Sequence, residues 1–123
     1  MMKLKVGNDI IETERIKRLY EKYADNFKNK VYTSKEIEYC ESKKLNKFQS
    51  YAGRFAAKEA VFKAISQGFS NKYQINWKDI EILNDVSGRP YVNLNNINFV
   101  EGIDISISHI KDYAIATVIV VFK

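Results

Sequence analysis

The hydrophobic pattern is most regular over Lys47–Ile65, which predicts an α-helix because it is rich in strong helix formers and contains no proline. At about 100° per residue, one side of this helix carries Phe48, Tyr51, Ala52, Phe55 and Phe62. A second stripe consists of small residues: Ala52, Gly53, Ala56, Ala60 and Ala64. Small side chains let another backbone approach closely, so we expect this helix to lie wedged between neighbouring elements. Glu59 falls on the apolar side and is expected to point inward.

The residues before this helix predict one strand and two helices. Lys3–Val6 alternates polar and apolar residues, as in a short strand, and Gly7-Asn8-Asp9 then supplies turn chemistry. Thr13 or Glu12 opens a helix with one apolar face, formed by Ile16, Leu19, Tyr20 and Tyr23. Thr33-Ser34-Lys35-Glu36 has the spacing of a capping box, so a short helix is expected to begin there and to end near Lys43-Lys44.

The second half of the chain predicts strands. Asp79–Leu83 and Tyr91–Leu94 flank the turn residues 85–88, and Ile103–Ile110 alternates again. Ala114–Phe122 is almost wholly apolar and β-branched, which is expected of a strand buried on both sides. One strand, then helices, then antiparallel hairpins predicts an α+β fold, with helices packed on one face of an antiparallel sheet. Without a linker or repeat, residues 1–123 are expected to form a single domain.

Composition and charge limit the class of protein, the compartment and the partners that we expect. Apolar residues make up 46% of the chain and charged residues 28%, as in ordinary globular proteins. The opening MMKLKVGND lacks the apolar core of a secretory signal, and a single cysteine, Cys40, fits a reducing compartment. We therefore expect a cytoplasmic protein. The net charge of +5 favours an anionic partner without choosing among nucleic acid, a phosphorylated cofactor and an acidic protein.

Two carboxylates are candidates for chemistry. Asp9 follows Gly-Asn, where an aspartate is usually a turn residue or a helix cap. Glu59 interrupts an apolar helix face, and an ionised carboxylate there needs a cation or several hydrogen-bond donors. A metal ion is one such partner, and an ion pair with Lys63, four residues further on, is the plainer alternative.

The remaining candidates are single residues. His109 lies on an alternating strand, where a lone histidine is more often part of the core than catalytic. Cys40 has no histidine near it in the sequence and is not expected to be a nucleophile. The basic residues Lys43, Lys44 and Lys47 fit a solvated turn.

In combination, these stretches resemble a known family. GNDIIETERI at residues 7–16 resembles the Gly-x-Asp-Ile-x-Glu-x-x-Arg-Ile opening of holo-acyl-carrier-protein synthases. FKNKVYTSKEIEYC resembles the family's Phe-x-x-Lys/Arg-hydrophobic-x-Thr-x-x-Glu block. RFAAKEAVFKAI at residues 54–65 is similar to its most diagnostic segment, Arg-Phe-Ala-Ala-Lys-Glu-Ala-x-x-Lys-Ala. NWKDIEI, SGRPYV and SISHIKDYAIATVIV follow in the family's order, so the resemblance covers nearly the whole chain.

The resemblance implies a 4′-phosphopantetheinyl transferase of the small, trimeric type, with that family's fold and with sites between subunits. Such enzymes transfer phosphopantetheine from coenzyme A to a serine of apo-acyl carrier protein in fatty acid biosynthesis, and they release adenosine 3′,5′-bisphosphate. The matching carboxylates, Asp9 and Glu59, would bind Mg²⁺, which prefers a few carboxylates together with phosphate oxygens and water. Glu59 would accept the serine proton, directly or through water. Lys63 would bind phosphate or assist proton transfer, and both roles stay open.

The resemblance also divides the basic residues into two groups. Arg54, Lys63 and His109 match positions that hold coenzyme A, and a guanidinium suits phosphate oxygens well. The predicted first helix would dock the carrier protein through Arg15, Arg18 and Lys22, with Lys28 just after it. The family's glycine-rich loop is reduced here to Ile65-Ser66-Gln67-Gly68, so only Gly68 is expected to approach the cofactor there.

Two other functions compete with the transferase. A metal-dependent nuclease also uses Asp, Glu and Lys, but usually with Glu and Lys two residues apart on a strand, whereas Glu59 and Lys63 are four apart on a predicted helix. A basic RNA-binding module is supported by charge alone, since no aromatic-basic RNA-binding motif is present. We therefore expect coenzyme A and acyl carrier protein as partners, and neither nucleic acid nor a membrane.

Overall fold

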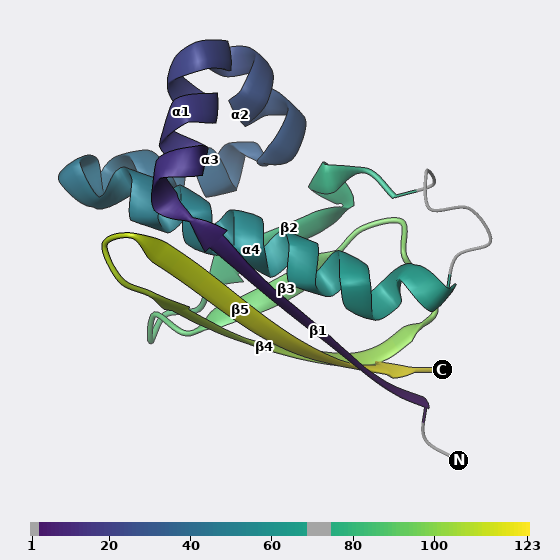
Figure 1. The fold of residues 1–123 in the computed structure, drawn as a ribbon. Coiled ribbons are helices and arrows are strands. Elements are labelled where there is room, and N and C mark those ends of the chain that lie inside the picture. The colour runs from purple at the N-terminus through teal and green to yellow at the C-terminus, as the bar shows by residue number, and fades with distance from the viewer. Residues whose placement is uncertain (1–2, 69–74) are drawn as a thin grey trace.

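The computed structural model describes residues 3–68 and 75–123 and combines helices with two antiparallel sheets (Figure 1). The first half contains β1 (Lys3–Glu12), α1 (Thr13–Tyr23), α2 (Asp25–Val31), α3 (Ser34–Ser42) and α4 (Lys47–Ile65). The second half contains β2 (Ile80–Asn84), β3 (Pro90–Leu94), β4 (Val100–His109) and β5 (Tyr113–Phe122). Short 3₁₀ turns η1 (Lys44–Asn46), η2 (Ser66–Gly68) and η4 (Trp77–Asp79) connect them. The α+β class is confirmed.

The strands are divided between two sheets, and α4 lies across the larger one. That sheet has the order β1-β5-β4, with β5 antiparallel to both neighbours, while β2 and β3 form a separate hairpin. Helices α1, α2 and α3 are grouped at one end of α4, on the same side of the sheet (Figure 1). None of the helices in the described segments is long and apolar enough to cross a membrane.

Local sequence signals account for several of the boundaries. The hydroxyl of Thr33 accepts a hydrogen bond from the backbone N–H of Glu36, and the Glu36 carboxylate accepts one from the N–H of Thr33. The predicted capping box is thus confirmed, and α3 begins at Ser34. Pro90 is the first residue of β3, where its missing N–H is tolerated.

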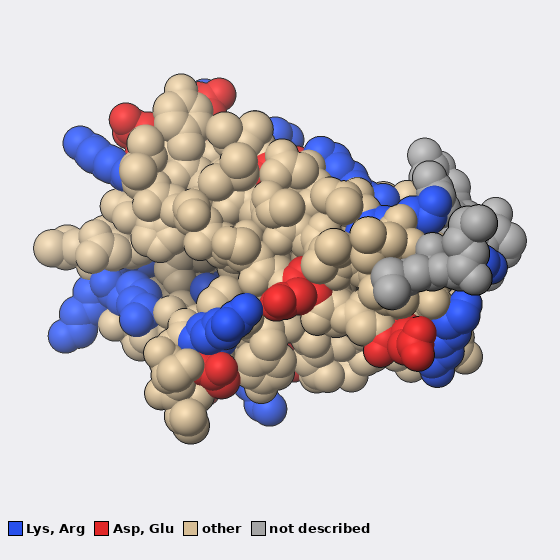
Figure 2. Space-filling model, turned by 90° about the horizontal axis from the view of Figure 1, so that it is seen from below, with Lys and Arg blue, Asp and Glu red and all other residues tan. Residues whose placement is uncertain are grey.

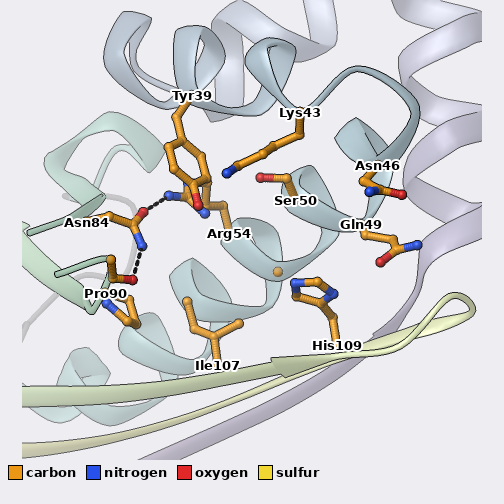
Figure 3. Close-up of a pocket in the computed structure, with 12 residues that line it drawn as sticks. Tyr39, Lys43, Asn46, Gln49, Ser50, Arg54, Asn84, Pro90, Ile107 and His109 are labelled. Atoms are coloured by element: carbon orange, nitrogen blue, oxygen red, sulfur yellow. Dashed lines mark hydrogen bonds between the residues drawn. The ribbon is translucent and has the colours of Figure 1, made fainter. Parts of the chain in front are cut away.

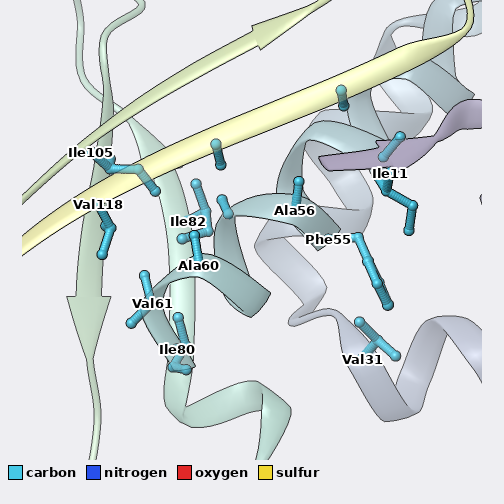
Figure 4. Close-up of a cluster of buried hydrophobic side chains, with 14 of the residues drawn as sticks. Ile11, Val31, Phe55, Ala56, Ala60, Val61, Ile80, Ile82, Ile105 and Val118 are labelled. Carbon is cyan, nitrogen blue, oxygen red and sulfur yellow. The ribbon is translucent and has the colours of Figure 1, made fainter. Parts of the chain in front are cut away.

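Helix α4 is buried on most of its surface, as its two stripes predict. Val61 of α4 belongs to the same buried cluster as Ile80 and Ile82 of β2 and Val118 of β5 (Figure 4). Beneath the helix, Ala114 and Ala116 of β5 are almost completely buried. Small residues on α4 and on β5 therefore allow the helix backbone to pack close to the sheet.

Gly7 of β1 lies directly against the backbone of α4 at Ala60. A Cβ atom at Gly7 would overlap the carbonyl group of Ala60 and press on the N–H of Ala64. Glycine is required there because no side chain fits between strand and helix. This contact sets the distance between β1 and α4, and hence between Asp9 and the helix residues opposite it.

A buried ion pair joins the first helices to α4 and β2. Lys58 Nζ lies 2.6 Å from Glu36 Oε1, and both side chains are inaccessible to solvent. Lys58 also donates to the carbonyl oxygens of Val31 and Trp77, at 2.7 and 3.1 Å. Glu36 Oε2 accepts from the N–H of Ile82 at 2.8 Å. Two buried charges are tolerated because each is hydrogen-bonded on several sides.

Three details differ from the expectations. Gly7-Asn8-Asp9 is not a turn, because β1 pairs with β5 along its whole length, Asp9 opposite Ala116. The stretch Asp25–Val31, for which no element was expected, is helix α2. Strand β5 is buried on one face only in the single chain, since Ile115 and Ile119 are exposed.

We expect Gly7→Ala to destabilise the fold by about 1–3 kcal/mol, the usual effect of overfilling a packed contact. The new methyl group would meet backbone atoms of α4, which have little room to move. Gly102→Ala in β4 is the matched control, because a Cβ there has no neighbour within 4 Å. Denaturant unfolding at fixed protein concentration measures both variants, and equal stabilities would contradict the assigned contact.

Candidate functional site

Asp9, Glu59 and Lys63 come together at the edge of the sheet formed by β1. Lys63 Nζ lies 3.0 Å from Asp9 Oδ1 and donates to the backbone carbonyl of Asn8 at 3.0 Å. The Asp9 side chain is only 17% exposed, whereas that of Lys63 is 52% exposed. Asp9 is positioned by β1 and the other two residues by the second half of α4, so strand and helix jointly build the cluster.

The cluster carries more negative charge than its lysine offsets. Burial raises the pKa of Glu59, and the nearby charge of Asp9 raises it further. The charges of Lys63 and Arg15 oppose this effect without cancelling it. Two carboxylates held this way favour an additional cation.

The plainer interpretation of Glu59, an ion pair with Lys63, is wrong. Among the described residues, the carboxylate that pairs with Lys63 is that of Asp9. Because β1 runs directly beside α4, the lysine reaches across to the strand, and Glu59 has no ion-pair partner within residues 3–68 and 75–123.

A second group of predicted residues lines a cavity on the other side of α4. The cavity has a volume of about 350 Å³, and Arg54 and His109 are among its walls (Figure 3). His109 is exposed and so is not a core histidine, contrary to the more usual interpretation of the sequence. Gly53 lies opposite Ile107 in this cavity, and a Cβ there would lie 3.3 Å from Ile107 Cγ2, which is a tight contact.

The cavity is rich in positive charge. The Arg54 guanidinium lies 3.8 Å from the centre of the Tyr39 ring and donates a hydrogen bond to Asn84. Lys43 Nζ lies 4.7 Å from the same ring. Arg54 Nε is buried with no hydrogen-bond partner among the described residues. Cations arranged around an aromatic ring, with one donor still unused, suit an anionic ligand.

Sequence reasoning missed most residues of this cavity, among them Tyr39, Lys43 and Asn84. Lys43 had the appearance of a solvated turn residue, and nothing in the spacing of Tyr39 or Asn84 indicated a shared site. The family-like segment SGRPYV was the available signal, because its Gly88 and Pro90 also line the cavity.

The two groups lie on opposite sides of the same chain. Asp9 is on β1 and His109 on β4, which are the two outer strands of the β1-β5-β4 sheet. Two strand spacings, about 10 Å, separate these strands, and α4 lies between the groups. The structure therefore brings Asp9, Glu59 and Lys63 together, and Arg54 and His109 together, but it does not join the two groups within one chain.

The predicted docking residues lie mostly on the surface. Arg15, Arg18 and Lys22 are exposed on α1. Lys28 is different, because its side chain is 18% exposed, pairs with Asp25 at 3.6 Å and covers the ring of Tyr20. Gly68 packs against the Phe99 ring, and residues 69–74, which follow it, lie outside the described residues.

Comparison with known proteins adds independent information. A model of the 4′-phosphopantetheinyl transferase superfamily matches residues 5–118. The holo-[acyl-carrier-protein] synthase of Ruminiclostridium cellulolyticum is 46% identical, over 97% of this chain and 92% of that protein. The one from Protochlamydia amoebophila is 48% identical, over 94% and 95% of the two chains. A crystal structure of the Bacillus anthracis enzyme, in complex with CoA (3′,5′-ADP), superposes with a TM-score of 0.80 at 31% identity and covers both chains completely.

The raised pKa of Glu59 predicts a pH-dependent effect on stability in metal-free protein. The folded chain binds this proton more tightly than the unfolded chain, so ionisation of Glu59 costs folding free energy as the pH rises above the ordinary value of 4.5. We expect Glu59→Gln to be more stable than the parent at pH 7, by about 0.5 kcal/mol. The difference should vanish below pH 4.5. Unfolding in the presence of EDTA across this range tests it, and a variant less stable at every pH would contradict it.

Proposed function

The chain belongs to the holo-[acyl-carrier-protein] synthases of the 4′-phosphopantetheinyl transferase superfamily, and on that premise we propose that Asp9 and Glu59 hold a Mg²⁺ ion for the transfer. The enzyme moves the 4′-phosphopantetheine group from coenzyme A to a serine of apo-acyl carrier protein. The serine oxygen forms a bond to the β-phosphorus of the pyrophosphate, the bond from that phosphorus to the bridging oxygen breaks, and adenosine 3′,5′-bisphosphate leaves.

The paired carboxylates are the observation that supports the metal site. Asp9 and Glu59 are close enough for one charge to raise the pKa of the other, and one of them is already shared with a lysine. The described residues contain no cluster of three or more His, Cys, Asp or Glu side chains able to hold a metal. Two carboxylates completed by substrate phosphate and water are the ligand set that Mg²⁺ prefers. When bound, the ion would neutralise charge on the phosphates.

Each residue of the cluster then has a role. Asp9 is held by β1 and by Lys63, so its carboxylate is oriented before substrate arrives. Glu59 is proposed to accept the serine proton, because burial and Asp9 make its carboxylate more basic than usual. Lys63, half exposed at the mouth of the cluster, can turn from Asp9 towards a phosphate oxygen.

The cationic cavity is proposed to hold the nucleotide end of coenzyme A. Arg54 and His109 face the cavity, together with Lys43 and Tyr39, and the unused Nε of Arg54 is a further donor for a phosphate. A volume of about 350 Å³ falls within the usual range for a small-molecule site. Gly68 remains a proposed contact of coenzyme A.

A homotrimer would join the two halves of the site. The outward face of the sheet exposes a row of apolar side chains, among them Val6, Ile10, Ile115 and Ile119. Figure 2 looks onto this side, where uncharged residues cover most of the surface. If three copies packed these faces around an axis, the β1 edge of each chain would lie beside the β4 edge of the next. The acidic cluster of one chain would then meet the cationic cavity of its neighbour.

The carrier protein is proposed to dock on α1. Arg15, Arg18 and Lys22 form a basic exposed surface, and Arg15 is near enough to lower the pKa of Glu59. Lys28 of α2 adds charge beside it. An acidic partner would be attracted to this surface and guided towards the site. We further propose that the chain acts as one domain in the cytoplasm.

Glu59→Gln tests the metal and proton-acceptor roles together. The change keeps the shape of the side chain but removes its charge, and we expect turnover to fall by about 100-fold or more while the fold survives. Purified protein is incubated with Mg²⁺, coenzyme A and apo-acyl carrier protein, and the mass of the carrier is measured. Glu38→Gln, at an exposed position of α3, is the matched control. Normal turnover in Glu59→Gln would refute both roles.

Mixed oligomers test whether the site is shared between chains. Glu59→Gln damages the acidic half and His109→Ala the cationic half, so each variant alone should have little activity at low coenzyme A concentration. If both are denatured and refolded together at equal concentration, about one site in four should be intact, because its two halves come from different chains. A mixture no more active than the separate variants would show that one chain supplies both halves.

A further inference from the structure

The carboxylate of Glu41 joins three helices at one point. Glu41 lies in the last turn of α3, and its Oε2 accepts a hydrogen bond from the Tyr20 hydroxyl of α1 at 2.9 Å. The same oxygen accepts a hydrogen bond from the Tyr51 hydroxyl of α4 at 2.6 Å. The hydroxyls of α1 and α4 thus share a single acceptor on α3.

Lys47 closes the cluster. Its Nζ lies 3.5 Å from Glu41 Oε1 and donates to the Tyr20 hydroxyl at 3.2 Å. Burial alone would raise the pKa of Glu41, but the hydrogen bonds from Tyr51 and Tyr20 and the charge of Lys47 outweigh it and lower the pKa. The carboxylate is therefore ionised at neutral pH, where its hydrogen bonds are stronger than those between neutral groups.

The cluster controls one end of α1. The helix is anchored near its start by Ile16, which is completely buried. One turn later, the Tyr20 ring packs edge-on against Phe48, with 5.0 Å between centroids, and at a tilt against Tyr51, at 5.5 Å. Apolar ring contacts allow a helix to slide or tilt, whereas a hydroxyl bound to a carboxylate has one preferred position.

Position matters here because α1 presents the basic surface. Arg15, Arg18 and Lys22 project from the helix that Tyr20 holds, and the charge of Arg15 reaches Glu59. A small tilt of α1 would move a docked carrier, and with it the serine, relative to the acidic cluster. Misplacement of about 1 Å at a reacting group can cost a large factor in rate.

We propose that Glu41 is a positioning residue that holds the carrier-docking helix α1 against α4 through Tyr20 and Tyr51. The proposal rests on the proposed function of α1 as the docking surface. Glu41 belongs neither to the acidic cluster nor to the walls of the cationic cavity, so it acts only through the helices it joins.

Glu41→Leu tests the proposal, because it removes the acceptor while keeping a side chain of similar size. We expect the KM for apo-acyl carrier protein to rise by about three- to tenfold, equivalent to losing part of one charge-assisted hydrogen bond. The KM for coenzyme A should stay within about twofold of the parent value. Glu41→Gln should restore most of the carrier KM, since an amide oxygen still accepts from both hydroxyls.

Three further variants make the outcome decisive. Arg18→Glu should raise the carrier KM whatever the role of Glu41, and an unchanged value would refute the docking function of α1 itself. The positioning role is overturned if Arg18→Glu raises the KM for carrier protein but Glu41→Leu does not. It is also overturned if Glu41→Leu raises the KM values for carrier protein and for coenzyme A by the same factor. Glu38→Gln, at an exposed position of the same helix α3, is the control without effect. If Glu41→Leu fails to fold, Tyr20→Phe removes one hydroxyl and carries the same expectation.

Discussion

The close approach of the sheet to α4 is the constraint on which the rest of the structure depends. Gly7 leaves no room for a side chain between β1 and the backbone at Ala60, and the alanines of β5 lie flat beneath the helix. Asp9 follows Gly7 by two residues on β1 and therefore lies at the surface of α4, where Lys63 forms an ion pair with it. A larger gap would leave the acidic groups too far apart to influence one another.

That closeness creates electrostatic repulsion between two carboxylates, and the proposed function makes use of it. Asp9 and Glu59 repel each other in a partly buried place, while Lys63 compensates for only one of them. Additional positive charge would relieve this repulsion. Under the proposed function a divalent ion would supply it, with the anionic phosphates of the substrate among its ligands, so the energetic disadvantage of the metal-free cluster would favour binding of the ion.

Elsewhere the chain keeps buried charge fully satisfied. Glu36 and Lys58 are inaccessible, yet each makes several hydrogen bonds, and together they tie α3, α4 and β2 into one unit. Glu41 makes a similar but more exposed junction between α1, α3 and α4. Charged groups therefore fix how the helices are oriented, whereas apolar contacts supply most of the burial. Glu59 contrasts with both, because it has no such set of hydrogen bonds among the described residues and is the carboxylate proposed to act in the transfer.

The sequence by itself determined the helices and strands wherever a local pattern was complete, including α4, the capping box of α3 and the alternation of β4. It also indicated the two carboxylates of the proposed metal site, because Glu59 breaks an apolar face and Asp9 belongs to a recognisable motif. Only the tertiary structure decided that Gly7-Asn8-Asp9 continues a strand, since its pairing with β5 outweighs local turn preference. It alone decided that Lys63 pairs with Asp9, and that His109 lies across the sheet from both. Distances between side chains depend on how elements far apart in the chain pack together, and local periodicity carries no information about that.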